Sequence, residues 1–355
     1  MNCKILSINP GSTSTKIAIY EDEKEIFCKI LDHPAEEIEK YNSVADQFNM
    51  RKEGVISFLE ENGYDVHELA AVVGRGGMVP SVKSGAYRVN EKMVDRLRNN
   101  PVVEHASNLG ALIAYDIANS IGVEAYIYDS VRVDEMKDIA RISGMPDIVR
   151  TSTSHALNTR AMAMKVAKKY GKKYTDMNFI VAHLGGGISI NVHEKGRMVD
   201  IIADDEGPFS PERAGRVPCN DLIDLCYSGK FDKSTMKKKL RGNGGLKAYL
   251  NTVDGREVQK MIDNGDENAK LIYEAMAYQV AKGIGELATV LEGKIDAIVI
   301  TGGIAYSNVI TSYIKKRVEF IAPVEIMAGE NEMESLSLGT LRVLRGEEEF
   351  KEYSE

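Results

Sequence analysis

Two short turns carry the residue types that bind anions. The first turn, Asn-Pro-Gly-Ser at 9–12, follows an apolar run and precedes a β-rich run at 13–20. It predicts a β-hairpin with Ser12, Ser14 and Lys16 at its tip. Hydroxyls, unpaired backbone N–H groups and a lysine ammonium together suit a phosphate or carboxylate. Taken alone, the same composition would also suit a solvated turn.

A second hairpin is predicted around three consecutive glycines at 185–187. An apolar run ends before these glycines, and the alternating run 188–192 follows them. Consecutive glycines adopt φ > 0 without penalty and let a ligand approach the backbone closely. His183 in this hairpin corresponds to Asn9 in the first one.

A second pair of similar segments follows the hairpins in the same order. Residues 71–77 and 297–303 both read as buried strands that stop at a double glycine. Two matching pairs in one order indicate an internal duplication. The sequence therefore predicts two related α/β halves, with a nucleotide between the two hairpin tips.

Three further residues have the chemistry of a reaction site. Arg75 is flanked by glycines and is predicted to have little packing of its own, so it could reach an anion; an incidental arginine in a surface turn is the alternative. Asp129 follows a predicted strand, and ligands collect at the carboxyl ends of strands in open α/β sheets. His105 is expected in the first turn of a helix that runs to Ile121, where a neutral imidazole is favoured. A lone histidine is more often structural than catalytic.

The amino-acid sequences of these motifs resemble those of one known family. Ser-Ile-Asn-Pro-Gly-Ser-Thr-Ser-Thr-Lys, Gly-Arg-Gly-Gly, Tyr-Asp-Ser, Thr-Ser-His-Ala-Leu-Asn, His-Leu-Gly-Gly-Gly-Ile-Ser and Thr-Gly-Gly-Ile-Ala are similar to motifs of the acetokinase family. That family belongs to the superfamily of acetate and sugar kinases, heat-shock chaperone ATPases and actin. The resemblance extends from Ile5 to about Leu344. It is greatest to the members that act on butyrate and branched-chain fatty acids.

The resemblance implies a fold and a reaction. The fold would be α/β, with two duplicated ribonuclease H-like (actin-like ATPase) domains and a cleft between them. Residues 1–150 with 335–355 would form the acyl-substrate domain, and 151–334 the nucleotide-binding domain. The reaction would be reversible phosphoryl transfer between ATP, with Mg²⁺, and a short-chain fatty acid to give an acyl phosphate. The family also implies a homo-oligomer, a dimer or larger.

The resemblance assigns roles to residues as well. Arg75 would hold the substrate carboxylate, and Arg213, with Arg216 as the second choice, would hold the transferring phosphoryl group. His105 and His183 are further catalytic candidates. The metal candidates are Asn9, Asp129 and Glu332, with Glu330 and Glu334 left open for the last. The expected nucleotide-binding residues are Asn9, Ser12, Ser14, Lys16, His183, Gly185, Gly186, Gly187, Gly302, Gly303 and Ile304. Where acetate kinases carry an additional histidine this chain has Thr151, although His155 is kept.

The expected preference for an acyl chain depends on a few apolar residues. Val79, Pro80, Pro101 and Val102 could line an apolar pocket that favours butyrate over acetate, or could simply belong to the core. Acetate and propionate kinases are the nearest alternatives. A sugar kinase or a non-kinase ATPase of the same fold is a more distant one.

Composition narrows the remaining possibilities. The net charge of −8 argues against a nucleic-acid surface, although a local basic cleft would be compatible with it. No apolar run reaches the length of a membrane span. A strand is expected within four residues of the start, which leaves no room for a signal peptide. The four cysteines have neither zinc nor disulfide-framework spacing. The expected location is the cytoplasm.

Overall fold

The computed structural model describes residues 2–354, which form two compact units. Unit 1 is the chain up to Asp134 together with the segment from Asn331 onward, and unit 2 is Glu135–Glu330. The sequence placed these boundaries near residues 150 and 335. Residues 135–150 belong to unit 2, and residues 331–334 belong to unit 1.

Unit 1 is built on a mixed sheet that has seven strands within the described residues. The strand order is β12-β5-β6-β4-β1-β2-β3. The strands are β1 (Lys4–Pro10), β2 (Ser14–Glu21), β3 (Lys24–Asp32), β4 (Leu69–Arg75), β5 (Ala86–Arg88), β6 (Glu124–Tyr128) and β12 (Lys351–Glu352). β1 and β2 form the predicted antiparallel hairpin, whereas β1, β4 and β6 are parallel. These parallel strands are apolar on both faces because helices cover both faces.

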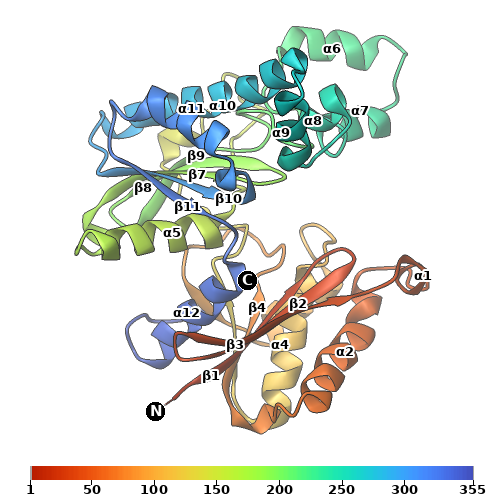
Figure 1. The fold of residues 1–355 in the computed structure, drawn as a ribbon. Helices are drawn as coiled ribbons and strands as arrows, with labels where there is room; N and C mark the ends of the chain where they lie inside the picture. The colour runs from red at the N-terminus through yellow and green to blue at the C-terminus, as the bar shows by residue number, and fades with distance from the viewer. Residues whose placement is uncertain (1, 355) are drawn as a thin grey trace. The chain divides into compact units, whose positions relative to one another are not determined.

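The helices of unit 1 divide between the two faces of this sheet. They are α1 (Ala35–Ile38), α2 (Phe48–Glu61), α3 (Glu91–Asn99), α4 (Asn108–Ile121) and α12 (Glu332–Leu344). α4 packs on β4 and β6 from one face with α2 beside it, and α12 packs on β1 and β4 from the other (Figure 1). A Cβ at Gly74 of β4 would lie 2.1 Å from the carbonyl oxygen of Gly110 in α4, so this close approach requires a glycine.

Unit 2 repeats the central part of this architecture. Its sheet has the order β11-β10-β7-β8-β9 among the described residues. The strands are β7 (Asn178–Leu184), β8 (Ile188–Glu194), β9 (Arg197–Ile202), β10 (Ala297–Gly302) and β11 (Val324–Ala328). As in unit 1, an antiparallel meander of three strands continues into parallel strands. The duplicated fold that the two hairpins predicted is therefore present.

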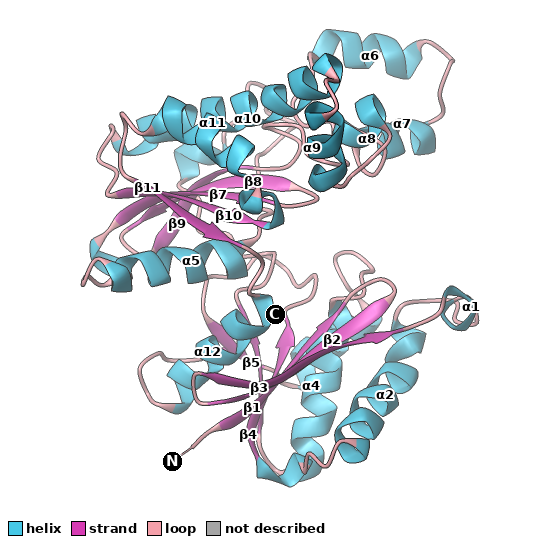
Figure 2. Ribbon diagram, in the orientation of Figure 1, coloured by secondary structure: helices cyan, strands magenta, loops and turns pink. Residues whose placement is uncertain are grey.

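Seven α-helices of unit 2 are described. They are α5 (Ala156–Lys169), α6 (Cys219–Tyr227), α7 (Lys233–Leu240), α8 (Gly245–Leu250), α9 (Gly255–Asp263), α10 (Glu267–Ala288) and α11 (Asn308–Val318). α5 packs on β7 and β10, and α10 covers the opposite face (Figure 2). α6 to α9 form the helical insertion that lengthens this half.

The helices α5 and α12 each pack in a different unit from the strand that precedes them in the chain. α5 follows β6 of unit 1 in the chain but packs on the sheet of unit 2, and α12 follows β11 of unit 2 but packs on the sheet of unit 1. In each unit, one covering helix therefore comes directly after a strand of the other unit in the chain. This exchange brings Glu332, at the start of α12, to the strands of unit 1.

Candidate active site

The tip of the β1–β2 hairpin presents Asn9 and Lys16 together. These residues are directly opposite in the antiparallel register, so their side chains leave the sheet on one face. The Gly11 N–H donates to the Ser14 carbonyl at 2.7 Å and closes the turn. Ser12 is exposed at the tip. The predicted anion-binding residues of unit 1 thus lie close to one another.

Glu332 joins Asn9 to Arg75. The Asn9 Nδ2 donates to Glu332 Oε2 at 2.6 Å, and Arg75 forms a short ion pair with Glu332 Oε1. An acidic residue in the first turn of α12 is favourable because the helix N-terminus is electropositive. A guanidinium carries five N–H donors, so the pair with Glu332 leaves donors for a ligand. The structure therefore unites a predicted metal residue with the predicted carboxylate-binding residue.

The environment of Arg75 differs from the sequence expectation. Its side chain is only 9% exposed, so the prediction that it lacks packing of its own is wrong, and so is the surface-turn alternative. The flanking glycines serve close packing: a Cβ at Gly76 would lie 2.9 Å from that of Ser130, and one at Gly77 would lie 2.7 Å from the Cα of Asn108.

Asp129 lies at the carboxyl end of β6, as predicted. Tyr128 is the β6 partner of Arg75, so Asp129 follows directly beside the end of β4. The carboxylate is 2% exposed, and its Oδ1 accepts the N–H of Gly85 at 2.7 Å. Its backbone has φ 40°, a left-handed conformation that is uncommon for non-glycine residues and is tolerated best by asparagine and aspartate. The sharp turn after the strand places the carboxylate at the sheet edge.

His105 does not lie in the first turn of α4. The helix begins at Asn108, and His105 is exposed in the turn before it. Its Nδ1 accepts the Ser107 N–H at 3.1 Å and lies 2.8 Å from Ser107 Oγ. Successive turns between residues 105 and 110 delay the start of the helix, so the helix-terminus argument for a neutral imidazole does not apply.

The glycine turn of unit 2 is shaped by the side chains around it. The Gly185 N–H donates to the Gly187 carbonyl at 3.1 Å. A Cβ at Gly187 would lie 2.1 Å from Arg213 Nη1, and one at Gly185 would lie 2.9 Å from both His183 Nε2 and Glu330 Oε1. The glycines therefore allow Arg213 and His183 to lie directly against the turn.

Arg213 rather than Arg216 adjoins this turn. Arg213 Nη1 donates to Asp204 Oδ2 at 2.6 Å, and Arg241 contacts the same oxygen at 3.1 Å. The Arg213 Nε is buried and has no hydrogen-bond partner among the described residues. Arg216 is more than half exposed and pairs with Glu286 at 3.2 Å. Of the two predicted arginines, Arg213 is thus the one that lies against the glycine turn.

Burial dominates the shifted pKa values next to this cluster. Burial, and then the charge of Asp204, raise the pKa of Asp205. Burial also raises the pKa of Asp200, although its ion pair with Arg150 opposes this effect. Both carboxyls lie where β9 runs into the loop that carries Arg213.

A pair of stacked histidines, His155 and His183, lies next to the glycine turn. The rings of His155 and His183 are stacked with centroids 3.9 Å apart. His155 Nδ1 lies 3.0 Å from Ser189 Oγ, and His183 Nδ1 lies 3.0 Å from Asn158 Oδ1. Thr301 donates to the same amide oxygen at 3.2 Å. The pair is held on both sides, so the orientation of His183 is well defined.

Unit 2 contains a pocket of about 970 Å³ next to the glycine turn. Of the predicted nucleotide-binding residues, Gly185, Gly186, Gly303 and Ile304 line it. Gly302 does not: it has φ 91°, and a Cβ there would lie 2.4 Å from the Leu184 carbonyl oxygen. The remaining lining residues are Pro211, Glu212, Val253, Asp254, Gly255, Arg256, Gln259, Tyr273, Tyr306, Ser307, Asn308, Val309 and Glu330.

Sequence reasoning missed the start of α9 in this pocket. Asp254 caps the helix by accepting the Arg256 N–H at 2.8 Å, and the Arg256 guanidinium donates to the same carboxylate at 2.6 Å. These hydrogen bonds lower the pKa of Asp254 to about 2. An aspartate before a helix is a general capping signal. Nothing in the local sequence separates this one from other caps.

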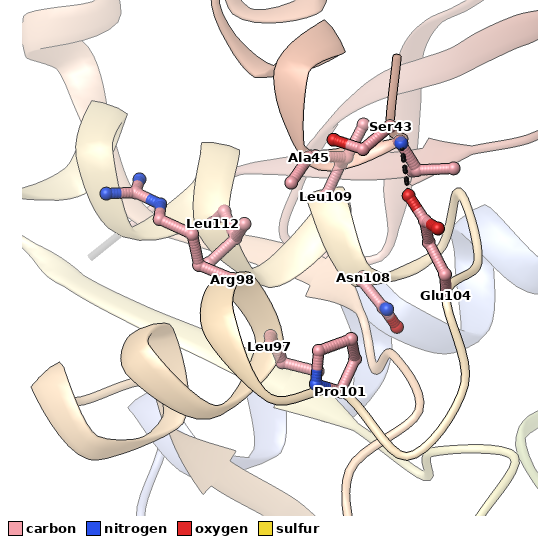
Figure 3. Close-up of a pocket in the computed structure, with 10 residues that line it drawn as sticks. Ser43, Ala45, Leu97, Arg98, Pro101, Glu104, Asn108, Leu109 and Leu112 are labelled. Atoms are coloured by element: carbon pink, nitrogen blue, oxygen red, sulfur yellow. Dashed lines mark hydrogen bonds between the residues drawn. The ribbon is translucent and has the colours of Figure 1, made fainter.

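A second, smaller pocket lies in unit 1 and has a volume of about 230 Å³ (Figure 3). Its apolar lining comes from α3, α4 and the segment before α2, and the Glu104 carboxylate accepts the Val44 N–H at 2.5 Å. Of the residues expected to line an acyl pocket, Pro101 lines this one. Val79 is fully buried in the core, and Val102 is 42% exposed.

Two features are absent from residues 2–354. No group of three or more histidine, cysteine, aspartate or glutamate side chains in this range is arranged to hold a metal ion. In the same range, no helix combines the length and apolarity that a membrane crossing requires.

Comparisons with known proteins place these features in context. A sequence profile described as the acetokinase family matches residues 125–335. Butyrate kinase 1 of Clostridium acetobutylicum is 53% identical over 352 residues, which cover 99% of each chain. Butyrate kinase 2 of the same organism is 50% identical over 99% of this chain and all of that protein. The crystal structure of Porphyromonas gingivalis acetate kinase superposes with a TM-score of 0.80, at 18% identity, over 96% of this chain and all of that one.

Proposed function

Because this chain belongs to the acetokinase family, we propose that it is an ATP-dependent butyrate kinase. It would transfer the γ-phosphoryl group of ATP reversibly to the carboxylate of butyrate or a branched relative. The observation that carries the proposal is sequence identity. Two proteins named butyrate kinases are 53% and 50% identical to this chain over 99% of its length. The chemistry of both units is compatible with this reaction.

The reaction requires positioning and charge stabilisation rather than a strong base. A carboxylate oxygen attacks the γ-phosphorus, a new P–O bond forms, and the bond from that phosphorus to the β–γ bridging oxygen breaks, which releases ADP. The carboxylate is already ionised at pH 7, so no proton has to be removed. Catalysis then depends on cations and N–H donors around the transferred group.

In unit 1 we assign the carboxylate to Arg75. Its pairing with Glu332 supports this role, because the glutamate holds the guanidinium in place while other N–H groups stay available. Asp129 and Glu332, with the Asn9 amide oxygen, are hard oxygen donors of the kind that Mg²⁺ takes together with substrate phosphates. When bound, Mg²⁺ neutralises phosphate charge. Lys16 adds a positive charge at the hairpin tip.

In unit 2 we assign the nucleotide to the 970 Å³ pocket. The Gly185 and Gly186 backbone would contact phosphates, and Gly303 and Ile304 would approach the nucleoside. Arg213 would stabilise the transferred phosphoryl group, which its place directly against the glycine turn supports. His183 would act by positioning, since it lies beneath the glycine turn.

A hydroxylamine-trapping assay tests the proposal directly. Purified protein, ATP and Mg²⁺ are incubated with acetate, propionate, butyrate, isobutyrate or glucose, and acyl phosphate is measured as the hydroxamate. We expect the highest kcat/KM for butyrate or isobutyrate. Acetate as the best substrate would leave a carboxylate kinase but exclude the butyrate assignment, and phosphorylation of glucose alone would exclude both.

A matched pair of variants tests the arginine assignment in the same assay. Arg213→Ala is expected to lose about 10²–10³-fold in kcat, the cost typical of a lost transition-state donor. Arg216→Ala is the control, because Arg216 pairs with Glu286 on the surface and should be dispensable. Equal effects of the two substitutions would contradict the assignment.

A further inference from the structure

Arg51 of α2 is fully buried beneath the tip of the β1–β2 hairpin. Its side chain is 0% exposed, and its guanidinium donates to three carbonyl groups of the tip. Nη1 donates to Gly11 O at 2.8 Å and to Ser14 O at 3.0 Å, and Nη2 donates to Ser12 O at 3.0 Å. One side chain therefore binds almost every carbonyl of the turn from a single side.

The other partners of Arg51 are neutral. Its Nε and Nη2 donate to Gln47 Oε1 at 3.1 and 2.9 Å, and Nη1 donates to Thr15 Oγ1 at 3.2 Å. Burial alone lowers the pKa of Arg51, and no carboxylate among residues 2–354 contributes an opposing shift. Thr15 in turn lies 2.8 Å from His33 Nε2; burial and the charge of Arg51 lower the pKa of that histidine, and the charges of Glu37 and Asp32 partly oppose this shift. Arg51 is thus not hydrogen-bonded to any carboxylate in the described part of the chain.

This arrangement has two consequences for the hairpin. The carbonyl oxygens that bind Arg51 point to the inner side of the turn. They therefore do not face an anion bound on the outer side, which they would otherwise repel. A buried charge is also screened less than an exposed one, so its field reaches through the turn to the tip. Both effects favour an anion next to Ser12 and Lys16.

We propose that Arg51 is a positioning residue of the phosphate-binding hairpin, which orients the turn and adds a positive charge behind the bound phosphoryl group. The proposal rests on the proposed kinase function for the identity of the anion. The alternative is that Arg51 only ties α2 to the hairpin. That role would depend on its hydrogen bonds and not on its net charge.

Gln47→Glu separates these two roles. The new carboxylate can accept the same two hydrogen bonds, so the turn keeps its shape while the charge of Arg51 is compensated. We expect the KM for ATP, and the KM for butyryl phosphate in the reverse direction, to rise about tenfold, as an effect of one partly screened charge. The KM for butyrate should not rise, and the midpoint of thermal unfolding should not fall.

Gln47→Met is the matched control, because it removes the acceptor without adding a charge. It should lower the unfolding midpoint more than Gln47→Glu does and change the KM for ATP less than threefold. Wild-type KM values in Gln47→Glu, or equal rises in both variants, would overturn the proposal. These variants decide the question even if Arg51→Met fails to fold.

Calorimetric titration with ATP keeps the two proposals apart. A wild-type protein that binds ATP but forms no acyl phosphate would refute the kinase function alone. Weaker ATP binding by Gln47→Glu than by wild type would then still support Arg51, and equal binding would refute it. A wild-type protein that does not bind ATP would overturn both.

Discussion

Gly187→Ala should slow catalysis because the new methyl group displaces the neighbouring side chain of Arg213. The Cβ of the alanine would lie 2.1 Å from Arg213 Nη1 and 2.5 Å from its Cζ. An ordinary separation of non-bonded atoms is about 3.5 Å, so the guanidinium must retreat by about 1.4 Å. That movement breaks the 2.6 Å hydrogen bond to Asp204.

The structure also gives the expected size of the effect. The crowded atoms are the end of a flexible side chain, and Gly187 does not have a positive φ, so the protein should fold. A misplacement of about 1 Å in a reacting group can cost about 10²-fold in rate. We therefore expect kcat to fall about 10²-fold, or about 2.7 kcal/mol in activation free energy, with little change in the KM for ATP.

Steady-state kinetics with butyrate and ATP, together with urea unfolding, would check this prediction. Gly285→Ala is the control: a Cβ there meets no atom within 4 Å, and alanine in the last turn of α10 should not destabilise the protein. In the double variant with Arg213→Ala, the effect of Gly187→Ala should largely disappear. A folded Gly187→Ala protein with kcat within twofold of wild type would refute the reasoning.

Three further predictions concern other parts of the chain. Asp129→Asn should leave the stability of the protein unchanged, because asparagine tolerates φ 40° and can still accept the Gly85 N–H. Its kcat should fall about 10²–10³-fold because the charge is lost. Retained turnover at saturating Mg²⁺ would remove Asp129 from the mechanism. Gly74→Ala should lower the free energy of unfolding by about 1–3 kcal/mol or more, because its Cβ meets the backbone of Gly110 at 2.1 Å, and a wild-type urea midpoint would contradict this. Burial lowers the pKa of His193 to about 3, so the unfolded chain binds one more proton than the folded protein between about pH 3 and 6.5. Stability should fall with decreasing pH in that window, and the slope for His193→Gln should be smaller by about 1.4 kcal/mol per pH unit, which urea titrations at about pH 4 and 5.5 would measure.

Local patterns in the sequence were sufficient for the repeated parts of the fold. The two hairpins, the strands that end in double glycines and the position of Asp129 after a strand all follow from apolar alternation and turn residues within short windows. Such patterns depend on backbone conformation and on which face of an element is buried, and both are properties of neighbouring residues. The duplication was visible for the same reason.

The pairings that complete the site depend on tertiary structure. Arg75 and Glu332 are separated by 257 residues, and they meet because α12 packs on the sheet of unit 1 and not on that of unit 2. An amphipathic pattern shows that a helix has a buried face, but it does not specify which sheet that face covers. The same holds for Arg51: arginine is usually exposed in proteins, and only the packing of α2 against the hairpin directs this guanidinium to the carbonyls of the turn. The sequence determines the elements and their chemistry, and long-range packing determines which side chains act together.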